Sequence, residues 1–134
     1  MRLLVDTHCW LWQFLAPDRL RSDVVELLTD ERHDVFLFVA SAWEIVIKHG
    51  LGKLKLPTAP EHDIPDSLAA QGYLELPIEQ RHVLRLAQLP LHHKDPFDRI
   101  LVAQSHAEGL HLVTADRLML AYGVPVIWAG VDAP

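Results

Sequence analysis

Cysteine is almost absent from this chain, which has one, Cys9, among its 134 residues. A single cysteine excludes a disulfide framework and excludes metal sites that need several thiolates. No apolar run approaches the roughly 18 residues that a membrane-crossing helix requires. The apolar N-terminal segment is interrupted at Asp6, so a signal peptide is not expected. We therefore expect a cytoplasmic protein with a reduced thiol and no membrane contact.

Basic residues are also in the minority. Lys and Arg number 12 against 18 Asp and Glu, which gives a formal net charge of −6. Proteins that bind phosphate usually carry a basic surface, so the total charge argues against a nucleic-acid partner. That argument weakens if several carboxylates surround one cation, because the local field then differs from the total. Hydrophobic residues make up 50% of the chain, and the length fits one domain over residues 1–134.

Apolar runs and helical patterns alternate along the chain. Strands are predicted at 2–5, 35–39, 73–76, 111–114 and 124–128. Helices are predicted around 10–12 and at 19–30, 41–49, 66–71, 79–88, 96–108 and 116–122. This alternation predicts an α/β fold with a parallel sheet of four to five strands and helices on both faces. The proline-rich stretch 57–65 is expected to be a surface connection.

Four acidic residues fall at predicted strand ends or in the first turns of predicted helices. They are Asp6, Glu44, Asp98 and Asp116. In a parallel sheet the strand-to-helix turns lie along one edge, where ligands bind, so we expect the four carboxylates to converge. Two carboxylates about 4 Å apart repel by roughly 4 kcal/mol at an effective dielectric near 20. A divalent cation would remove this repulsion, and oxygen ligands suit Mg²⁺ or Mn²⁺.

Each acid taken alone also fits a structural role. The segment from Ser41 to Glu44 has the pattern of a capping box, in which the glutamate returns to the N-cap amide. Asp95, which precedes a proline, fits an N-cap, and we assign it mainly to capping. The other three acids suit turns or the positive ends of helix dipoles. Only the set of four favours a metal site.

Four short segments follow one another in a specific order. They are Leu3-Leu4-Val5-Asp6-Thr7-His8, Ser41-Ala42-Trp43-Glu44-Ile45, Asp95-Pro96-Phe97-Asp98-Arg99 and Val113-Thr114-Ala115-Asp116. Together they make a chain that resembles the PIN-domain family, and within it the VapC toxins of bacterial toxin–antitoxin pairs. The resemblance extends over residues 2–129 and implies a single PIN-like domain. It implies an endoribonuclease that uses one or two Mg²⁺ or Mn²⁺ ions and a metal-activated water as nucleophile.

The resemblance also implies roles for particular residues and partners. It places the acidic metal ligands on the same four positions, Asp6, Glu44, Asp98 and Asp116, of which the last varies within the family. It maps the family's small hydroxyl residues onto Thr7 and Ser41. It implies RNA as the substrate, a homodimer, and a small protein antitoxin that blocks the site or its approach.

Two other functions remain compatible with the sequence. One is a PIN-like binding module without catalysis, which is disfavoured because all four acidic positions are filled. The other is a metal-dependent phosphoesterase with a substrate other than RNA, against which only the family resemblance argues.

The basic residues near these segments have open roles. Lys48, Lys53 and Lys55 form the densest basic segment, which fits either a solvated helix end or a contact with the RNA backbone. Arg99 could reach a phosphate, although pairing with Asp95 is the expected role.

The histidines and tryptophans favour structural roles. His92 and His93 lack the spacing of a zinc motif and are expected to be polar loop residues. Trp43 and Trp128 are expected in the core or at its edge.

Overall fold

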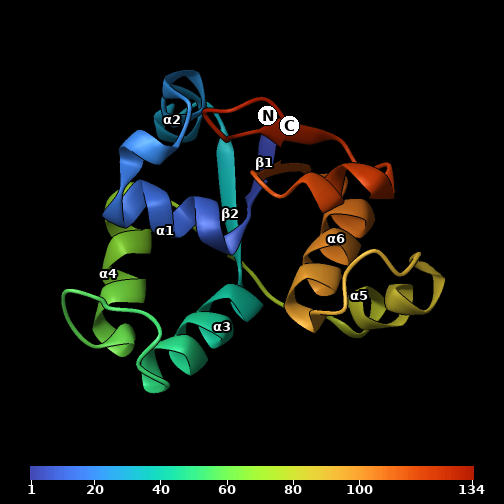
Figure 1. Ribbon diagram of the computed structural model, residues 1–134, viewed down its shortest axis with the longest axis horizontal. Helices are drawn as coiled ribbons and strands as arrows, with labels where there is room; N and C mark the ends of the chain where they lie inside the picture. The colour runs from blue at the N-terminus through green and yellow to red at the C-terminus, as the bar shows by residue number, and fades with distance from the viewer.

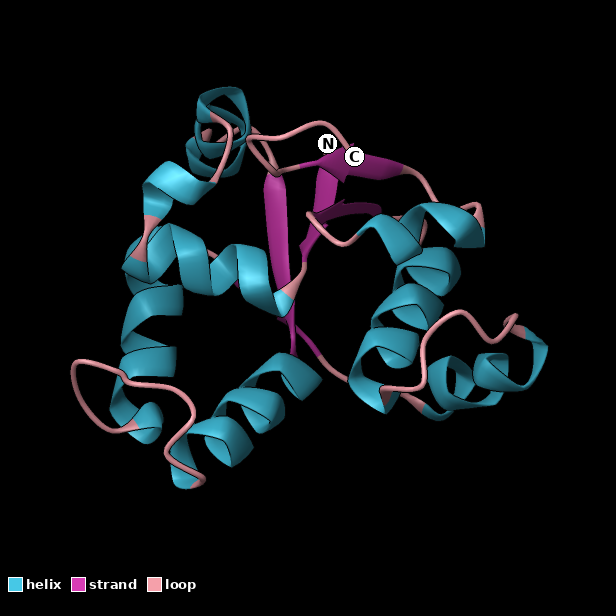
Figure 2. Cartoon of the chain, viewed as in Figure 1, coloured by secondary structure: helices cyan, strands magenta, loops and turns pink.

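The computed structural model describes all 134 residues and contains one five-stranded sheet in the order β3-β2-β1-β4-β5. The strands are β1 (Arg2–Val5), β2 (Asp34–Phe38), β3 (Leu74–Leu76), β4 (His111–Thr114) and β5 (Val126–Trp128). Every neighbouring pair of strands is parallel. Figure 2 shows helices on either side of the strands. The predicted α/β class and the predicted five strands are confirmed.

Six α-helices and three short 3-10 helices connect the strands. The α-helices are α1 (Thr7–Leu15), α2 (Ser22–Thr29), α3 (Val39–Gly50), α4 (Pro60–Gln71), α5 (Gln80–Arg85) and α6 (Pro96–Glu108). The 3-10 helices are η1 (Pro17–Arg19), η2 (Leu86–Gln88) and η3 (Arg117–Tyr122). None of these helices combines the length and the apolar character needed to cross a bilayer.

The central strand β1 is buried on both faces. Leu3, Leu4 and Val5 are each 0% exposed, and successive side chains of a strand point to opposite faces. Leu3 and Val5 join a core cluster that includes residues of α1, α2 and α4, whereas Leu4 joins a second cluster with α6. In Figure 1, α1, α2 and α4 lie to the left of β1 and β2, and α6 lies to the right. The continuous apolar character of β1 therefore follows from its place between two helical layers.

The strand order fixes where a ligand can bind. The chain runs outward from β1 through β2 to β3, returns through α6, and adds β4 on the other side of β1. The direction of winding therefore reverses between β1 and β4. In open α/β sheets this reversal opens a crevice at the carboxyl ends of the two strands. Asp6 follows β1 and hydrogen-bonds through its backbone N–H to the carbonyl of Val113 on β4, at 2.9 Å.

The proline-rich stretch differs from the prediction. It was expected to be a surface connection, but α4 begins at Pro60 rather than at residue 66. Proline at the first helical position loses no hydrogen bond, because that N–H has no partner in any helix. Pro65 lies inside the helix, where it removes one backbone hydrogen bond. Ile64 and Leu68, one turn apart, are 7% and 5% exposed, so their burial against the sheet compensates for that loss.

The helix predicted over residues 19–30 is interrupted. Residues Pro17–Arg19 form η1, and the chain is extended at Arg21 before α2 begins at Ser22. Leu20 is buried and pairs in an isolated antiparallel bridge with Gly130 near the C-terminus. This bridge requires extended backbone, which a continuous helix would not provide.

Candidate functional site

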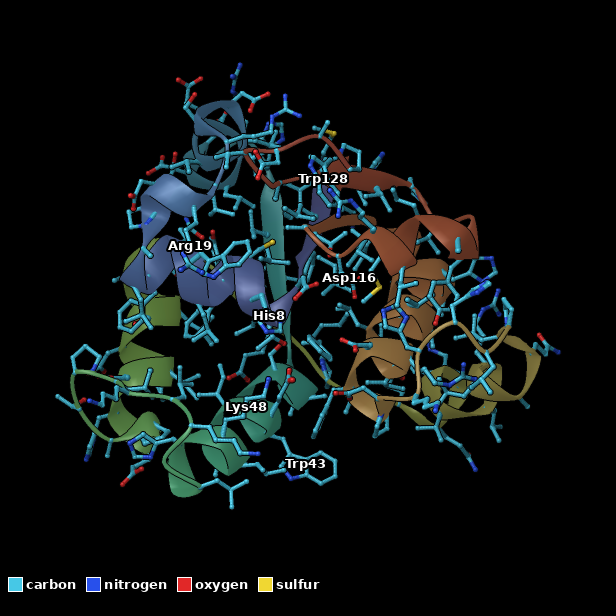
Figure 3. All side chains as sticks on the ribbon, viewed as in Figure 1. His8, Arg19, Trp43, Lys48, Asp116 and Trp128 are labelled. Atoms are coloured by element: carbon cyan, nitrogen blue, oxygen red, sulfur yellow. The ribbon has the colours of Figure 1, made fainter.

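The carboxyl edge of the sheet gathers the acidic residues that the sequence singled out. Asp6 follows β1, Glu44 lies in α3, Asp98 lies in the first turn of α6, and Asp116 follows β4. Asp98 is close enough to Asp6 and Glu44 for their negative charges to raise its pKa. In Figure 3, His8, Lys48 and Asp116 approach this region from α1, α3 and the end of β4.

Asp6 is held rigidly on both of its oxygens. It is 5% exposed. Its Oδ2 accepts a hydrogen bond of 2.7 Å from the Thr114 hydroxyl, and its Oδ1 accepts one of 2.9 Å from the backbone N–H of His8. The second bond makes Asp6 the N-cap of α1. The His8 ring lies 3.7 Å from Oδ1, and its interaction with the Asp6 carboxylate raises the pKa of His8 in spite of partial burial.

Glu44 does not form the predicted capping box. Helix α3 begins at Val39, and its N-cap Phe38 has no side-chain capping bond. Glu44 therefore lies in the second turn, where no N-cap amide is within reach. Its carboxylate, 5% exposed, instead pairs with Lys48 one turn later, with Nζ 2.9 Å from Oε2. The alternative structural role of Glu44, in a capping box, is therefore wrong, and its carboxylate is close enough to Asp98 to raise the pKa of that residue.

Asp116 is held by a histidine that sequence reasoning missed. His93 is 6% exposed, and its Nε2 lies 2.7 Å from Oδ2 of Asp116. The hydroxyl oxygen of Tyr122 accepts the backbone N–H of His93 at 3.0 Å and lies 2.7 Å from His93 Nδ1. The hydroxyl proton is then free to be donated to Nδ1, which assigns the ring proton to Nε2. His93 therefore donates to Asp116 and fixes its orientation.

His93 lies in a loop, as predicted, but the sequence did not indicate its burial or its bond to Asp116. Its partner Asp116 lies 23 residues further along the chain, and no local pattern links the two. Only the adjacency of the loop before α6 to the end of β4 could have indicated the contact. His92, in contrast, is exposed and packs edge-on against Tyr122.

Among the four acidic residues, Asp98 has the negative charge that is least offset by neighbouring groups. No hydrogen bond or ion pair is formed by its carboxylate, although a ligand atom of each of His93, Asp98 and Asp116 lies within 4.8 Å of the others. Burial raises the pKa of Asp98 to about 6, and the charge of Asp95 adds to the effect. Asp95 itself caps α6 by accepting the N–H of Phe97 at 2.8 Å, as predicted.

The residues proposed to contact substrate occupy different environments. Thr7 and Ser41 are buried and share a hydroxyl–hydroxyl hydrogen bond of 2.7 Å. Lys53 is exposed and lines a groove with His8 and Lys48. Lys55 is exposed at the end of the same segment.

Arg99 does not pair with Asp95. Its guanidinium donates to the backbone carbonyls of Leu86 and Pro90, at 3.1 and 3.0 Å. Those carbonyls belong to η2 and to the loop that follows it, so Arg99 fastens this segment to α6. The expected ion pair was wrong because Asp95 turns toward the N-terminus of α6 to cap it.

Trp43 and Trp128, both predicted in the core or at its edge, differ in their exposure. Trp128 is half-buried at the end of β5, as expected for a residue at the edge of the core. Trp43 is 61% exposed and lies edge-on to Phe97, with ring centroids 5.1 Å apart. Its predicted place in the core was wrong, because Ala40, Ile45 and Glu44 occupy the buried face of α3.

A second cluster of ligand-type side chains lies on α5 and α6. Glu79, His82 and Glu108 approach one another closely. His82 is 0% exposed and already bonds Glu79 N–H and Glu108, and Arg81 pairs with both glutamates. These charges are neutralised within the protein, so the cluster acts as a clamp between α5 and α6.

The PIN domain family profile matches residues 3–124. This match covers most of the chain, including all four acids of the site. The chain belongs to the PIN domain family.

Individual relatives match at lower coverage or lower identity. Ribonuclease VapC16 from Mycobacterium tuberculosis (strain ATCC 25618 / H37Rv) is 35% identical over 68 residues, which is 48% of this chain and 48% of that protein. The match thus spans about half the length of this curated relative.

Solved structures share the fold. A chain in the crystal structure of VapBC2 from Rickettsia felis, bound to a DNA fragment from their promoter, superimposes with a TM-score of 0.73 at 14% identity, covering 96% of this chain and 99% of that chain. A chain in a toxin–antitoxin complex from Klebsiella pneumoniae gives a TM-score of 0.60 at 18% identity, covering 94% and 96%.

The donor set at the sheet edge fits a hard divalent cation. The side chains offer carboxylate oxygens, which Mg²⁺ and Mn²⁺ prefer. Lys48 pairs with Glu44 and the Thr114 hydroxyl bonds Asp6, whereas Asp98 forms no hydrogen bond or ion pair and has only the His93 ring close to it. A cation bound beside Asp98 would offset both the burial of its charge and the repulsion from neighbouring carboxylates, which together raise its pKa.

Replacing Asp98 with asparagine tests this unfavourable charge in the metal-free protein. Because the pKa of Asp98 is raised to about 6, folded protein holds this proton more tightly than unfolded protein, so stability falls as pH rises from about 4 to about 6. Asp98→Asn should therefore raise the melting temperature at pH 7 and leave it unchanged near pH 4. Solvent screening of the partly exposed carboxylate limits the gain to about 1 kcal/mol, or about 3 °C.

The control is Asp66→Asn, which changes an exposed aspartate of α4. Thermal melts of both variants in chelator, at the two pH values, make the comparison. If Asp98→Asn instead lowers the melting temperature at pH 7, the charged carboxylate of Asp98 stabilises the folded protein and the prediction is wrong.

Proposed function

We propose that this protein is an Mg²⁺- or Mn²⁺-dependent endoribonuclease that acts in the cytoplasm as the toxin of a type II toxin–antitoxin pair. The observation that carries the proposal is the uncompensated carboxylate of Asp98 beside Asp6, Glu44 and Asp116, in a member of the PIN domain family. The relative named Ribonuclease VapC16 and the fold shared with chains of toxin–antitoxin complexes support it.

The four carboxylates would hold one or two metal ions. When bound, the metal neutralises charge on the phosphodiester and makes a bound water a better nucleophile. Asp6 and Asp98 are the direct or bridging ligands in this proposal, Glu44 is a ligand or orients the water, and Asp116 serves a second site or acts through water.

The surrounding residues prepare the carboxylates for that task. Thr114 and the N-terminus of α1 fix both oxygens of Asp6. Lys48 restrains Glu44, and His93 restrains Asp116. Because Asp6, Glu44 and Asp116 are oriented before substrate arrives, these three side chains need not reorganise during the reaction. Lys53, Lys55 and Arg99 remain predicted substrate contacts, and the position of Lys53 beside His8 favours its contact with the RNA backbone.

The toxin role implies two protein contacts. One is a small antitoxin that covers the acidic site or its approach. The other is a second copy of this chain, which we place at the apolar cleft between α3, α5 and α6. Trp43, Val83 and Phe97 line this cleft, which has a volume of about 280 Å³. Val46, Ile47 and Leu51 continue the exposed apolar surface along α3, and homodimer interfaces are the apolar class of protein interface.

Cleavage should depend on both the metal and the acids. Purified protein is expected to cut RNA with Mn²⁺ or Mg²⁺ and to stop in chelator. Asp6→Asn and Asp98→Asn should each lower the rate by at least about 100-fold, because each removes a charge from the metal site and little volume. The readout is gel analysis of a labelled RNA, with Asp66→Asn as the control. Full activity in chelator would exclude the metal mechanism.

His93 should act through Asp116 on metal affinity. His93→Gln removes the bond to Asp116 and is expected to weaken Mn²⁺ binding by about 10- to 100-fold. Calorimetric titration measures this without RNA, and His92→Gln on the exposed neighbour is the matched control. Equal Mn²⁺ affinity in the two variants would assign His93 a purely structural role.

Trp43→Glu should shift the protein from dimer to monomer. The substitution places a charge in the lining of the apolar cleft, where a second copy would exclude water. Sedimentation velocity measures the change, and Val131→Glu, at a residue 62% exposed outside the cleft, is the control. If Trp43→Glu sediments like the parent, the apolar cleft is not the dimer interface.

A further inference from the structure

A second groove begins beside the acidic site, and none of the four acidic residues lines it. Trp12 of α1, Arg19 of η1, Arg117 of η3 and Trp128 of β5 line it, together with Ala115, the residue before Asp116. Its volume is about 270 Å³, close to the smallest ligand pockets of proteins. In Figure 3, Arg19 lies on the opposite side of this region from Trp128 and Asp116. We call it the arginine–tryptophan groove.

The two arginines give the groove positive charge in a chain whose net charge is −6. Neither arginine forms an ion pair. The Arg19 guanidinium lies 5.7 Å above the centre of the Trp12 ring, and Arg117 donates a single bond of 3.1 Å to the carbonyl of Ala133. Both therefore keep donors free for an anion. One acid, Asp132, also lines the groove.

The Trp128 ring is held in place before any ligand arrives. Its Nε1 donates a hydrogen bond of 2.7 Å to the carbonyl of Asp132. Gly130 lies against the ring so closely that a Cβ there would come within 3.3 Å of it. The chain thus supports the ring, and Trp128 lines the groove with a fixed aromatic surface. A ring that is already ordered loses no rotamer freedom when a ligand stacks on it.

We propose that the arginine–tryptophan groove binds a single-stranded segment of RNA next to the cleavage site, with a base stacked on Trp128 and backbone phosphates held by Arg19 and Arg117. The inference rests on the proposed ribonuclease function and names the substrate class. Stacking on an aromatic side chain requires a base that has left its own helix, so single strands fit and duplexes do not. Stacking tolerates every base, so the groove positions the strand without selecting its sequence.

Removal of the two arginines tests the groove directly. All variants carry Asp98→Asn, so that RNA is not cut while it binds, and affinity is measured by fluorescence anisotropy with a labelled, unstructured RNA of about 12 nucleotides. Arg19→Gln with Arg117→Gln should weaken binding by at least about tenfold. The loss of two phosphate contacts should also reduce the slope of log affinity against log salt by about 1.4.

The matched control removes two positive charges from the opposite edge of the sheet. Arg2→Gln with Arg32→Gln makes the same change in net charge at residues that lie at or before the starts of β1 and β2. This control should bind RNA as tightly as the parent. Equal losses of RNA affinity in the two double variants would mean that net charge alone governs binding. That result would overturn the proposal that the groove binds RNA.

The aromatic contact has its own pair of variants. Trp128→Phe keeps a ring and should retain most of the affinity, whereas Trp128→Leu removes the ring and should lower affinity by about tenfold. Melting temperatures identify any Trp128 variant that loses affinity only because it is unstable. The arginine variants then still test the groove, because Arg19 and Arg117 are exposed. A hairpin duplex of the same length should bind weakly to the parent and to all variants alike.

The outcomes separate the groove from the ribonuclease function. One outcome would overturn only the proposal that the groove binds RNA. In it the wild-type protein cleaves RNA, but the arginine variants and Trp128→Leu bind RNA as tightly as the parent. The groove would then be a site for a protein segment. Absence of both cleavage and RNA binding would overturn the proposed function and the groove together.

Discussion

Repulsion among carboxylates at one edge of a parallel sheet is the constraint on which this structure depends. The βαβ connections bring the carboxyl ends of β1, β2 and β4 to the same edge, and each of these strands is followed by an acid. Asp98 adds a fourth charge from the start of α6. A fold that places four like charges together must compensate them or use them. Here the protein does both, since three acids have bonded partners and the fourth does not.

The partners differ in kind, and this difference gives the site its asymmetry. Asp6 is satisfied by a hydroxyl and a backbone amide, which are neutral donors and leave its negative charge intact. Glu44 faces a lysine ammonium, which neutralises it. Asp116 receives an imidazole N–H. Because only Glu44 faces a lysine, the negative charge of the site is concentrated on Asp6, Asp98 and Asp116.

Much of this architecture follows from patterns of the sequence. Continuous apolar runs identified the strands, and strand ends identified Asp6 and Asp116, because both signals are local. The environment of Glu44 was mistaken, since the segment from Ser41 satisfies a capping pattern while α3 begins two residues earlier at Val39. The burial of His93 was missed and the placement of Trp43 was wrong for another reason. Burial of His93 depends on Tyr122, far along the chain, and exposure of Trp43 depends on which face of α3 meets the sheet.

The hydrogen bond between Thr114 and Asp6 joins residues 108 positions apart. It exists only when β4 has paired with β1, which is the pairing that also brings Asp116 to the site. A nascent chain therefore lacks both the donor that orients Asp6 and the fourth carboxylate until residues 111–116 are present and β4 has paired with β1. The acidic site therefore cannot assemble from the first three strands alone, and any product truncated before β4 lacks it.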